Sequence, residues 1–128
     1  MNAKCQLTAA VLLGALAGAA VVQGLHAQVK PKAYLVTESQ ILDAAALPAL
    51  AQKTQAVLRA AGGRTIVSNR GKITAVMGTA PARFGVSEWE TIEKAQAYIS
   101  SPERKALDPE RDKAVKIVRQ FILEAPAD

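Results

Sequence analysis

The order of strand-like and helix-like segments is the strongest constraint on the fold of this chain of 128 residues. Short runs of branched and aromatic residues predict strands, and longer stretches with apolar residues three or four positions apart predict helices. The sequence predicts strands at 33–37, 64–67, 73–77, 83–89 and 120–123. Helices are predicted between the first two of these strands and between the last two. The order strand, helix, hairpin, helix, strand predicts a ferredoxin-like βαββαβ two-layer sandwich of the α+β class, with both helices on one face of an antiparallel sheet.

The first helix has a clear end and an ambiguous start. Gly62 and Gly63 are expected to end it, because glycine adopts the left-handed conformation at a helix C-terminus without strain. Asp43 has a side chain suited to the N-cap. Pro48 leaves two possibilities: the helix starts near Leu47 with Pro48 in its first position, or its first turn lacks a hydrogen bond.

Three capping signals follow the strand predicted at 83–89. Thr91 is suited to cap the second helix. Ser101 and Asp108 each precede a proline and a glutamate, which is typical of a helix start, so further helical stretches are predicted there.

The C-terminal segment fits two structures. Val115, Val118 and Phe121 have a spacing that would also suit a helix, whereas residues 120–123 form a compact apolar run. We predict a strand at 120–123 because of that run.

Large apolar side chains fall on both faces of the predicted strands. One set comprises Tyr34, Val36, Phe84, Val86, Phe121 and Leu123, and the alternating set comprises Leu35, Trp89 and Ile122. The sequence does not decide which set faces the helices, because a shift of one residue in register exchanges the faces. In either case one apolar set lacks a cover, and an exposed patch of that size is usually an interface. We therefore expect a homodimer that pairs sheet to sheet.

The N-terminal 27 residues have the composition of a secretory signal peptide. No charged residue stands between Lys4 and Lys30, and the apolar run at 7–22 precedes Ala27, a small residue suited to the position before a cleavage site. The alternative is an uncleaved membrane anchor, since about 20 apolar residues can span a bilayer.

The predicted domain organisation follows from that cleavage. We predict a signal peptide at 1–27, a short linker at 28–32 and a ferredoxin-like, dimeric α+β barrel domain at 33–125. The mature protein is expected in the periplasm or outside the cell, without stable insertion in a membrane.

Five stretches spread over the predicted domain carry a resemblance to a known family. They are residues 33–36, 61–64, the strand ending at Trp89, 95–103 and 121–124. In their order and spacing the sequence resembles the small proteins catalogued as domain of unknown function 1330, within the dimeric α+β barrel superfamily. The resemblance implies this fold and dimerisation but no activity, because the family has no agreed one. Related superfamily members include monooxygenases and isomerases that act on small molecules. Members usually carry an aromatic residue after Ser-Pro-Glu, where this chain has Arg104.

Several classes of chemistry are absent from the sequence. Cleavage after Ala27 removes Cys5 and His26, the only cysteine and the only histidine. The mature chain then has no Ser-His-Asp or Cys-His pair, and we expect no transition-metal ion and no other cofactor. No GxGxxG motif or phosphate-binding loop is present. We expect no nucleic-acid partner, because residues 103–119 mix six basic with four acidic side chains instead of forming a stripe of one sign.

Four residues are candidates for ligand binding. Tyr34, Trp89 and Tyr98 could line a pocket between the sheet and the helices, although aromatic side chains at such spacing more often belong to the core. Arg111 is the arginine best placed to bind an acidic ligand, and an ion pair within its helix is the alternative. No catalytic residue is assigned.

Two carboxylates offer an acid–base pair only if they are adjacent. Glu38 and Glu88 each follow an apolar strand segment. The alternative is that both lie at solvated strand ends.

Three functions remain open from the sequence. The leading hypothesis is an exported homodimer that binds a small organic molecule or none. The second is a cofactor-independent enzyme acting on a small substrate, and the third is a structural or partner-binding dimer. A titratable carboxylate inside a pocket would distinguish the enzyme from the binding protein.

The predicted export can be checked directly. N-terminal sequencing of the protein from its own host should find a chain that begins near Gln28 in a soluble fraction. An intact Met1 in the membrane fraction would instead support the uncleaved anchor.

Overall fold

The computed structural model describes residues 30–68 and 71–126. Its contacts divide the chain into two units, Met1–Lys30 and Pro31–Asp128, and the second holds every helix and strand described below. The predicted signal peptide, and the linker as far as residue 29, lie outside the described residues. Among the residues that are described, no helix is both long and apolar enough to cross a membrane.

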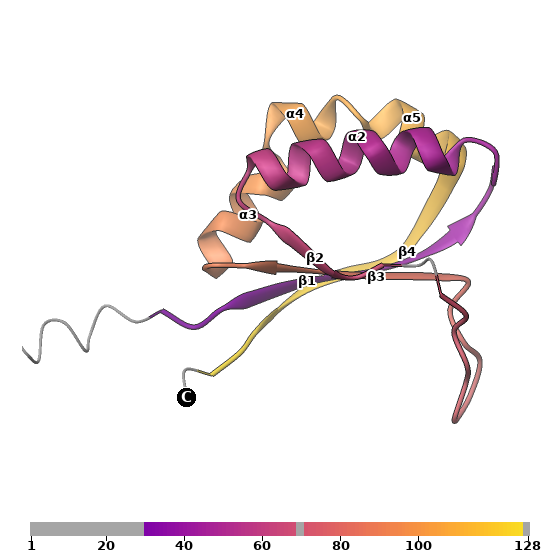
Figure 1. Ribbon diagram of the computed structural model, residues 1–128, viewed down its shortest axis with the longest axis horizontal. Helices are drawn as coiled ribbons and strands as arrows, with labels where there is room; N and C mark the ends of the chain where they lie inside the picture. Colours follow the sequence, from indigo (N-terminus) through magenta and orange to yellow (C-terminus); the bar gives the residue numbers. More distant parts are fainter. Residues whose placement is uncertain (1–29, 69–70, 127–128) are drawn as a thin grey trace, which may run out of the picture. The chain divides into compact units, whose positions relative to one another are not determined.

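The domain is a four-stranded sheet with its helices on one side (Figure 1). In chain order the elements are β1 (Ala33–Ile41), α2 (Leu47–Ala60), β2 (Arg64–Val67), β3 (Arg83–Trp89), α3 (Ile92–Ser100), α4 (Pro102–Lys105), α5 (Asp108–Ala114) and β4 (Val115–Glu124). The sheet order is β2-β3-β1-β4, and all three pairings are antiparallel. The predicted ferredoxin-like α+β arrangement is confirmed.

The prediction of a strand at 73–77 is wrong. These residues belong to the long connection between β2 and β3, where Val76 and Met77 are almost completely exposed. Because β2 pairs directly with β3, the apolar run at 73–77 has no neighbouring strand in the described part of the chain and cannot join the sheet.

The C-terminal segment is a strand throughout. β4 starts at Val115, directly after α5, and pairs with β1 over its whole length. A register shift opposite Glu38 and Ser39 accommodates one extra residue of β4. The helical spacing of Val115 and Val118 is therefore overridden by pairing with β1.

Two predicted helix caps are corrected and two are confirmed. α2 begins at Leu47 with Pro48 in its first turn, and the Asp43 carboxylate accepts a hydrogen bond from the Ala45 N–H (3.0 Å) in the preceding turn instead of capping the helix. Asp108 is the first residue of α5, not its cap. The caps at Thr91 and Ser101 are confirmed, since each side-chain oxygen accepts a backbone N–H from three residues later.

The strand register assigns the two apolar sets to opposite faces. Leu35 lies between Ser87 and Ile122, on the side covered by the helices, and next to it Ala33 pairs with Trp89. On the open side Val36 lies between Val86 and Phe121. The helix-covered set packs into a core of Ala33, Leu35, Leu58, Trp89, Ala95 and Tyr98. A second core cluster contains Leu50, Ala114 and Val115.

Trp89 is the most deeply buried large side chain among the described residues, at 1 % exposure. Its ring lies against Tyr98, with centroids 4.8 Å apart, and its indole N–H donates to the Ser87 hydroxyl (3.0 Å). The edge of the indole also meets the backbone of Gly63, where an added Cβ would lie 2.6 Å from two ring carbons. Both glycines were expected to end α2, but they have different roles. Gly62 has the left-handed conformation, with φ +92°, and Gly63 makes room for the indole.

This contact predicts the effect of one methyl group. Gly63→Ala should lower the free energy of unfolding by about 1–3 kcal/mol, because the Cβ forces the indole or the backbone to move. Urea denaturation followed by tryptophan fluorescence measures it. Gly71→Ala is the matched control, since a Cβ there meets nothing within 4 Å and the stability should hardly change. Equal stability of Gly63→Ala and the wild type would contradict the close contact between Trp89 and Gly63.

Candidate functional site

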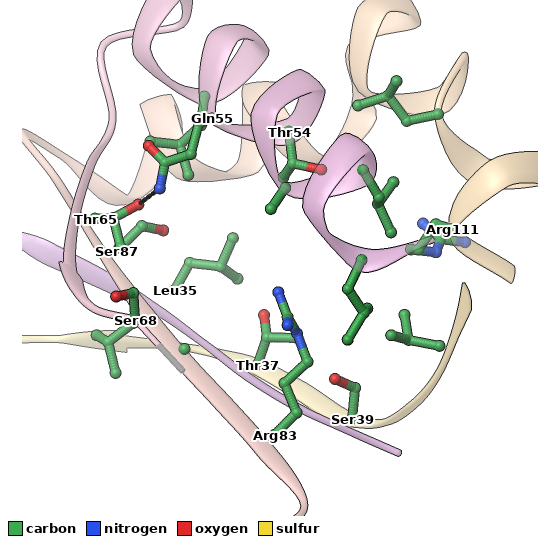
Figure 2. A pocket seen from close by; sticks show the side chains of 18 of the residues that line it. Leu35, Thr37, Ser39, Thr54, Gln55, Thr65, Ser68, Arg83, Ser87 and Arg111 are labelled. Carbon is green, nitrogen blue, oxygen red and sulfur yellow. Dashed lines mark hydrogen bonds between the residues drawn. The ribbon is translucent and has the colours of Figure 1, made fainter. Parts of the chain in front are cut away.

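A pocket of about 760 Å³ lies between the sheet and the helix layer. Its floor consists of inward-facing residues of β1, β3 and β4, and α2 forms its roof (Figure 2). Residues of α3, α4 and α5 complete one wall. The pocket arises because the sheet and α2 touch through two separate core clusters and leave space between them.

The apolar part of the lining comes from both core clusters. It includes Leu35, Leu47, Leu50, Leu58, Val115 and Ile117. Such a lining favours the binding of an organic ligand over that of a hydrated ion.

Hydroxyl and amide groups occupy the middle of the pocket. The Gln120 Nε2 donates to the Thr37 hydroxyl oxygen (2.8 Å), and the Gln55 Nε2 donates to the Thr65 hydroxyl oxygen (2.6 Å). Each threonine oxygen thus serves as an acceptor, which leaves its own hydrogen available as a donor. The polar groups are therefore oriented before any ligand arrives.

Two arginines in the wall share one carboxylate. The Asp108 Oδ1 lies 2.5 Å from a guanidinium nitrogen of Arg104 and 2.5 Å from one of Arg111. Arg111 also binds Asp112 through two nitrogens, at 2.9 and 2.7 Å. Arg111 therefore lines the pocket and also forms ion pairs within its own helix, the two roles that the sequence left open.

A third arginine enters the pocket from the floor. Arg83 is the first residue of β3 and lies opposite Ser39 of β1. Its guanidinium rises toward α2 (Figure 2), and among the described residues it has no hydrogen-bond or ion-pair partner. Among the described residues of the floor, it is the side chain that brings an uncompensated charge to the pocket.

The aromatic candidates Trp89 and Tyr98 have different roles. Trp89 belongs to the core and does not line the pocket, whereas Tyr98 does both. Burial raises the pKa of the Tyr98 phenol above its usual value of 10.0, although the nearby Arg104 acts in the opposite direction. The phenol is therefore neutral near pH 7 and can act as a hydrogen-bonding group, not as a base.

The remaining candidates lie on the opposite face of the sheet. Tyr34 of β1 pairs with Glu88 of β3, and its side chain points away from the helices. Glu88 binds Arg64 (2.9 Å) and Lys32 (3.4 Å), and the hydrogen bond from Arg64 is the main cause of its lowered pKa.

Glu38 and Glu88 do not form an acid–base pair. Glu38 lies opposite Phe84 and Arg119, and Arg119 holds its carboxylate at 2.8 Å. Each carboxylate thus has its own basic partner, and neither reaches the pocket.

Four further residues line the pocket that were not among the candidates predicted from the sequence: Thr37, Arg83, Arg104 and Gln120. A signal for the floor was present. Thr37 and Ser39 are consecutive inward positions of β1, and Arg83, Gly85 and Ser87 are consecutive inward positions of β3. Polar or very small residues on the face that also carries Leu35 and Trp89 indicate a cavity where a core would otherwise be.

A family model, described as domain of unknown function (DUF1330), matches residues 32–125. No curated protein matches the sequence. Among solved structures, a protein of unknown function from Rhodopseudomonas palustris is similar, with a TM-score of 0.61, 14 % identity and coverage of 84 % of this chain and 93 % of that one. SnoaB, a cofactor-independent oxygenase from Streptomyces nogalater, is also similar, with a TM-score of 0.56, 9 % identity and coverage of 77 % and 96 %. At these identities the likeness is one of fold.

Proposed function

The chain belongs to the family described as domain of unknown function (DUF1330), and we propose that it is an exported homodimer that binds a small organic molecule between its sheet and α2. The pocket carries this proposal. Its volume of about 760 Å³ falls within the range of about 300–1,000 Å³ typical of small-molecule sites. An apolar lining with a few fixed polar groups is also typical of such sites.

The lining favours a binding protein over an acid–base enzyme. Among the described residues that line the pocket there is no aspartate, glutamate, histidine, cysteine or lysine. Burial raises the pKa of the Tyr98 phenol, which is far above neutral pH even in water, so this side chain stays protonated. General acid–base catalysis needs a group that exchanges a proton near the working pH, and the pocket walls supply none. The enzyme alternative is supported only by the shared fold of the Streptomyces oxygenase.

The open face of the sheet supports the second half of the proposal. Phe121 and Leu123 of β4 are each at least half exposed, at 50 % and 57 %. Each large apolar side chain moved out of water contributes roughly 1.5–3 kcal/mol. The carboxylates on this face, Glu38 and Glu88, are already paired with basic residues. A second copy of the same face can therefore meet it without placing unpaired carboxylates against each other, and a two-fold dimer needs only one self-complementary patch.

The proposed export rests on the sequence of residues 1–27 alone, which has the composition of a signal peptide.

Native mass spectrometry tests occupancy and assembly together. Protein purified from its own host should have the mass of two mature chains plus retained small molecules. Ala51→Trp, which places an indole at a pocket-lining position of α2, should lose the ligand mass and remain dimeric. Wild-type protein without added mass would contradict the binding function, and a monomer would contradict the assembly.

A charge on the open face should separate the subunits. Phe121→Glu is expected to give folded monomers at micromolar concentration, because it places two carboxylates in an apolar interface. Sedimentation or light scattering measures the change. Ala97→Glu, on an exposed position of α3, is the matched control and should stay dimeric. A Phe121→Glu protein that behaves as the wild type would show that this face is not the interface.

A further inference from the structure

We propose that the pocket is selective for an organic anion, and that Arg83 binds the anionic group, a carboxylate or a chemically similar oxyanion. This inference rests on the proposed binding function and names the class of ligand for that site.

The charge of the lining is one-sided. Four arginines line the pocket, namely Arg59, Arg83, Arg104 and Arg111, and none of its described residues is acidic. A lining with only cationic charged groups disfavours a cationic ligand, because like charges repel strongly where water is excluded. The choice is therefore between an anionic and a neutral molecule.

Two of the four cations are already compensated. Arg104 and Arg111 share Asp108, and Arg111 also binds Asp112, so that these four side chains together carry no net charge. Their guanidinium groups are held in place by these ion pairs. They form a rigid wall and contribute little to the binding of a further anion.

Arg59 and Arg83 remain without an ion-pair partner among the described residues. Arg83 is partly buried, while Arg59, at the last turn of α2, is exposed to solvent. A partly desolvated guanidinium without an acceptor is costly, and an oxyanion can satisfy it with two parallel hydrogen bonds. A neutral ligand would cover Arg83 and leave its charge unpaired.

The floor beside Arg83 offers a hydroxyl donor. The Thr37 hydroxyl oxygen already accepts the Gln120 amide, so its hydrogen is free to donate to a ligand. Thr37 and Arg83 both rise from the sheet into the same space (Figure 2). An oxyanion above them would gain one guanidinium and one hydroxyl donor, while the apolar walls take the rest of the molecule.

Two dyes with the same aromatic frame test the charge preference. Anilinonaphthalene sulfonate carries an oxyanion, and phenylnaphthylamine lacks it. Fluorescence titration of the wild type should show tighter binding of the sulfonate. Arg83→Leu should weaken the binding of the sulfonate by about 10- to 100-fold, as expected for the loss of a charge-assisted hydrogen bond. The affinity for the neutral dye should stay unchanged or rise slightly.

Three further variants make the result specific. Arg83→Gln keeps a polar side chain without the charge and should also lose the preference for the sulfonate. Lys105→Leu removes one positive charge from an exposed position that does not line the pocket, and should have no effect. Ala51→Trp should abolish pocket binding of both dyes, so that any fluorescence left in it measures binding elsewhere.

The outcomes separate this inference from the proposed function. If both dyes bind, Ala51→Trp blocks both, and Arg83→Leu changes neither, then the pocket binds ligands but Arg83 does not select anions. If Ala51→Trp blocks neither dye, the pocket does not bind these molecules and the proposed function fails with the inference.

Discussion

The separation between two core clusters determines the rest of this structure. At one end of α2, Leu58 packs with Trp89 and Tyr98, and at the other end Leu50 packs with Ala114 and Val115. α2 therefore contacts the sheet layer at two places, and neither cluster extends far enough to fill the space between them. Both clusters contribute to the lining of the resulting pocket. The same contacts that hold the helix layer in place thus keep the site open.

Small and polar residues prevent the core from closing that space. At the centre of the floor Thr37 lies between Gly85 and Gln120, a row without a single large apolar side chain. An added Cβ at Gly85 would meet only a backbone oxygen, that of Val67, at 3.8 Å. Protein interiors normally leave few voids larger than a water molecule. A sheet that places a glycine, a threonine and a glutamine side by side in this row leaves space for a cavity.

The fold could be predicted from the sequence because local signals and connectivity agree. Each strand of the final sheet has its own apolar run, and Thr91 and Ser101 begin helices as their types suggest. The errors arose where a local signal allowed more than one structure. The run at 73–77 is apolar enough for a strand but has no strand beside it among the described residues. Asp108 has a capping side chain, but α5 begins at this residue and its carboxylate binds Arg104 and Arg111.

The site was less predictable because it depends on the register. Leu35 and Val36 are equally apolar, so nothing within β1 says which of them faces the helices, and a slip of one residue would exchange the faces. Only the pairing of Ala33 with Trp89 settles that Tyr34 points away from the pocket. Tyr98 and Arg111 could be found because helical spacing fixes their direction locally. Arg83 could not, because its role follows from the strand opposite it.

The unpaired charge of Arg83 has a physical meaning for the fold as a whole. The other buried or partly buried charges described here are paired: Asp108 with two arginines, Glu88 with Arg64 and Lys32, Glu38 with Arg119. Against these pairs, Arg83 is a partly buried cation that has no partner among the described residues, and it lies in the pocket. Local inconsistencies of this kind are tolerated mainly where function needs them. The desolvation of the unpaired Arg83 lowers the stability of the empty domain, and an anionic ligand that pairs with Arg83 offsets this cost. Ligand occupancy and the stability of the domain are therefore linked through this side chain.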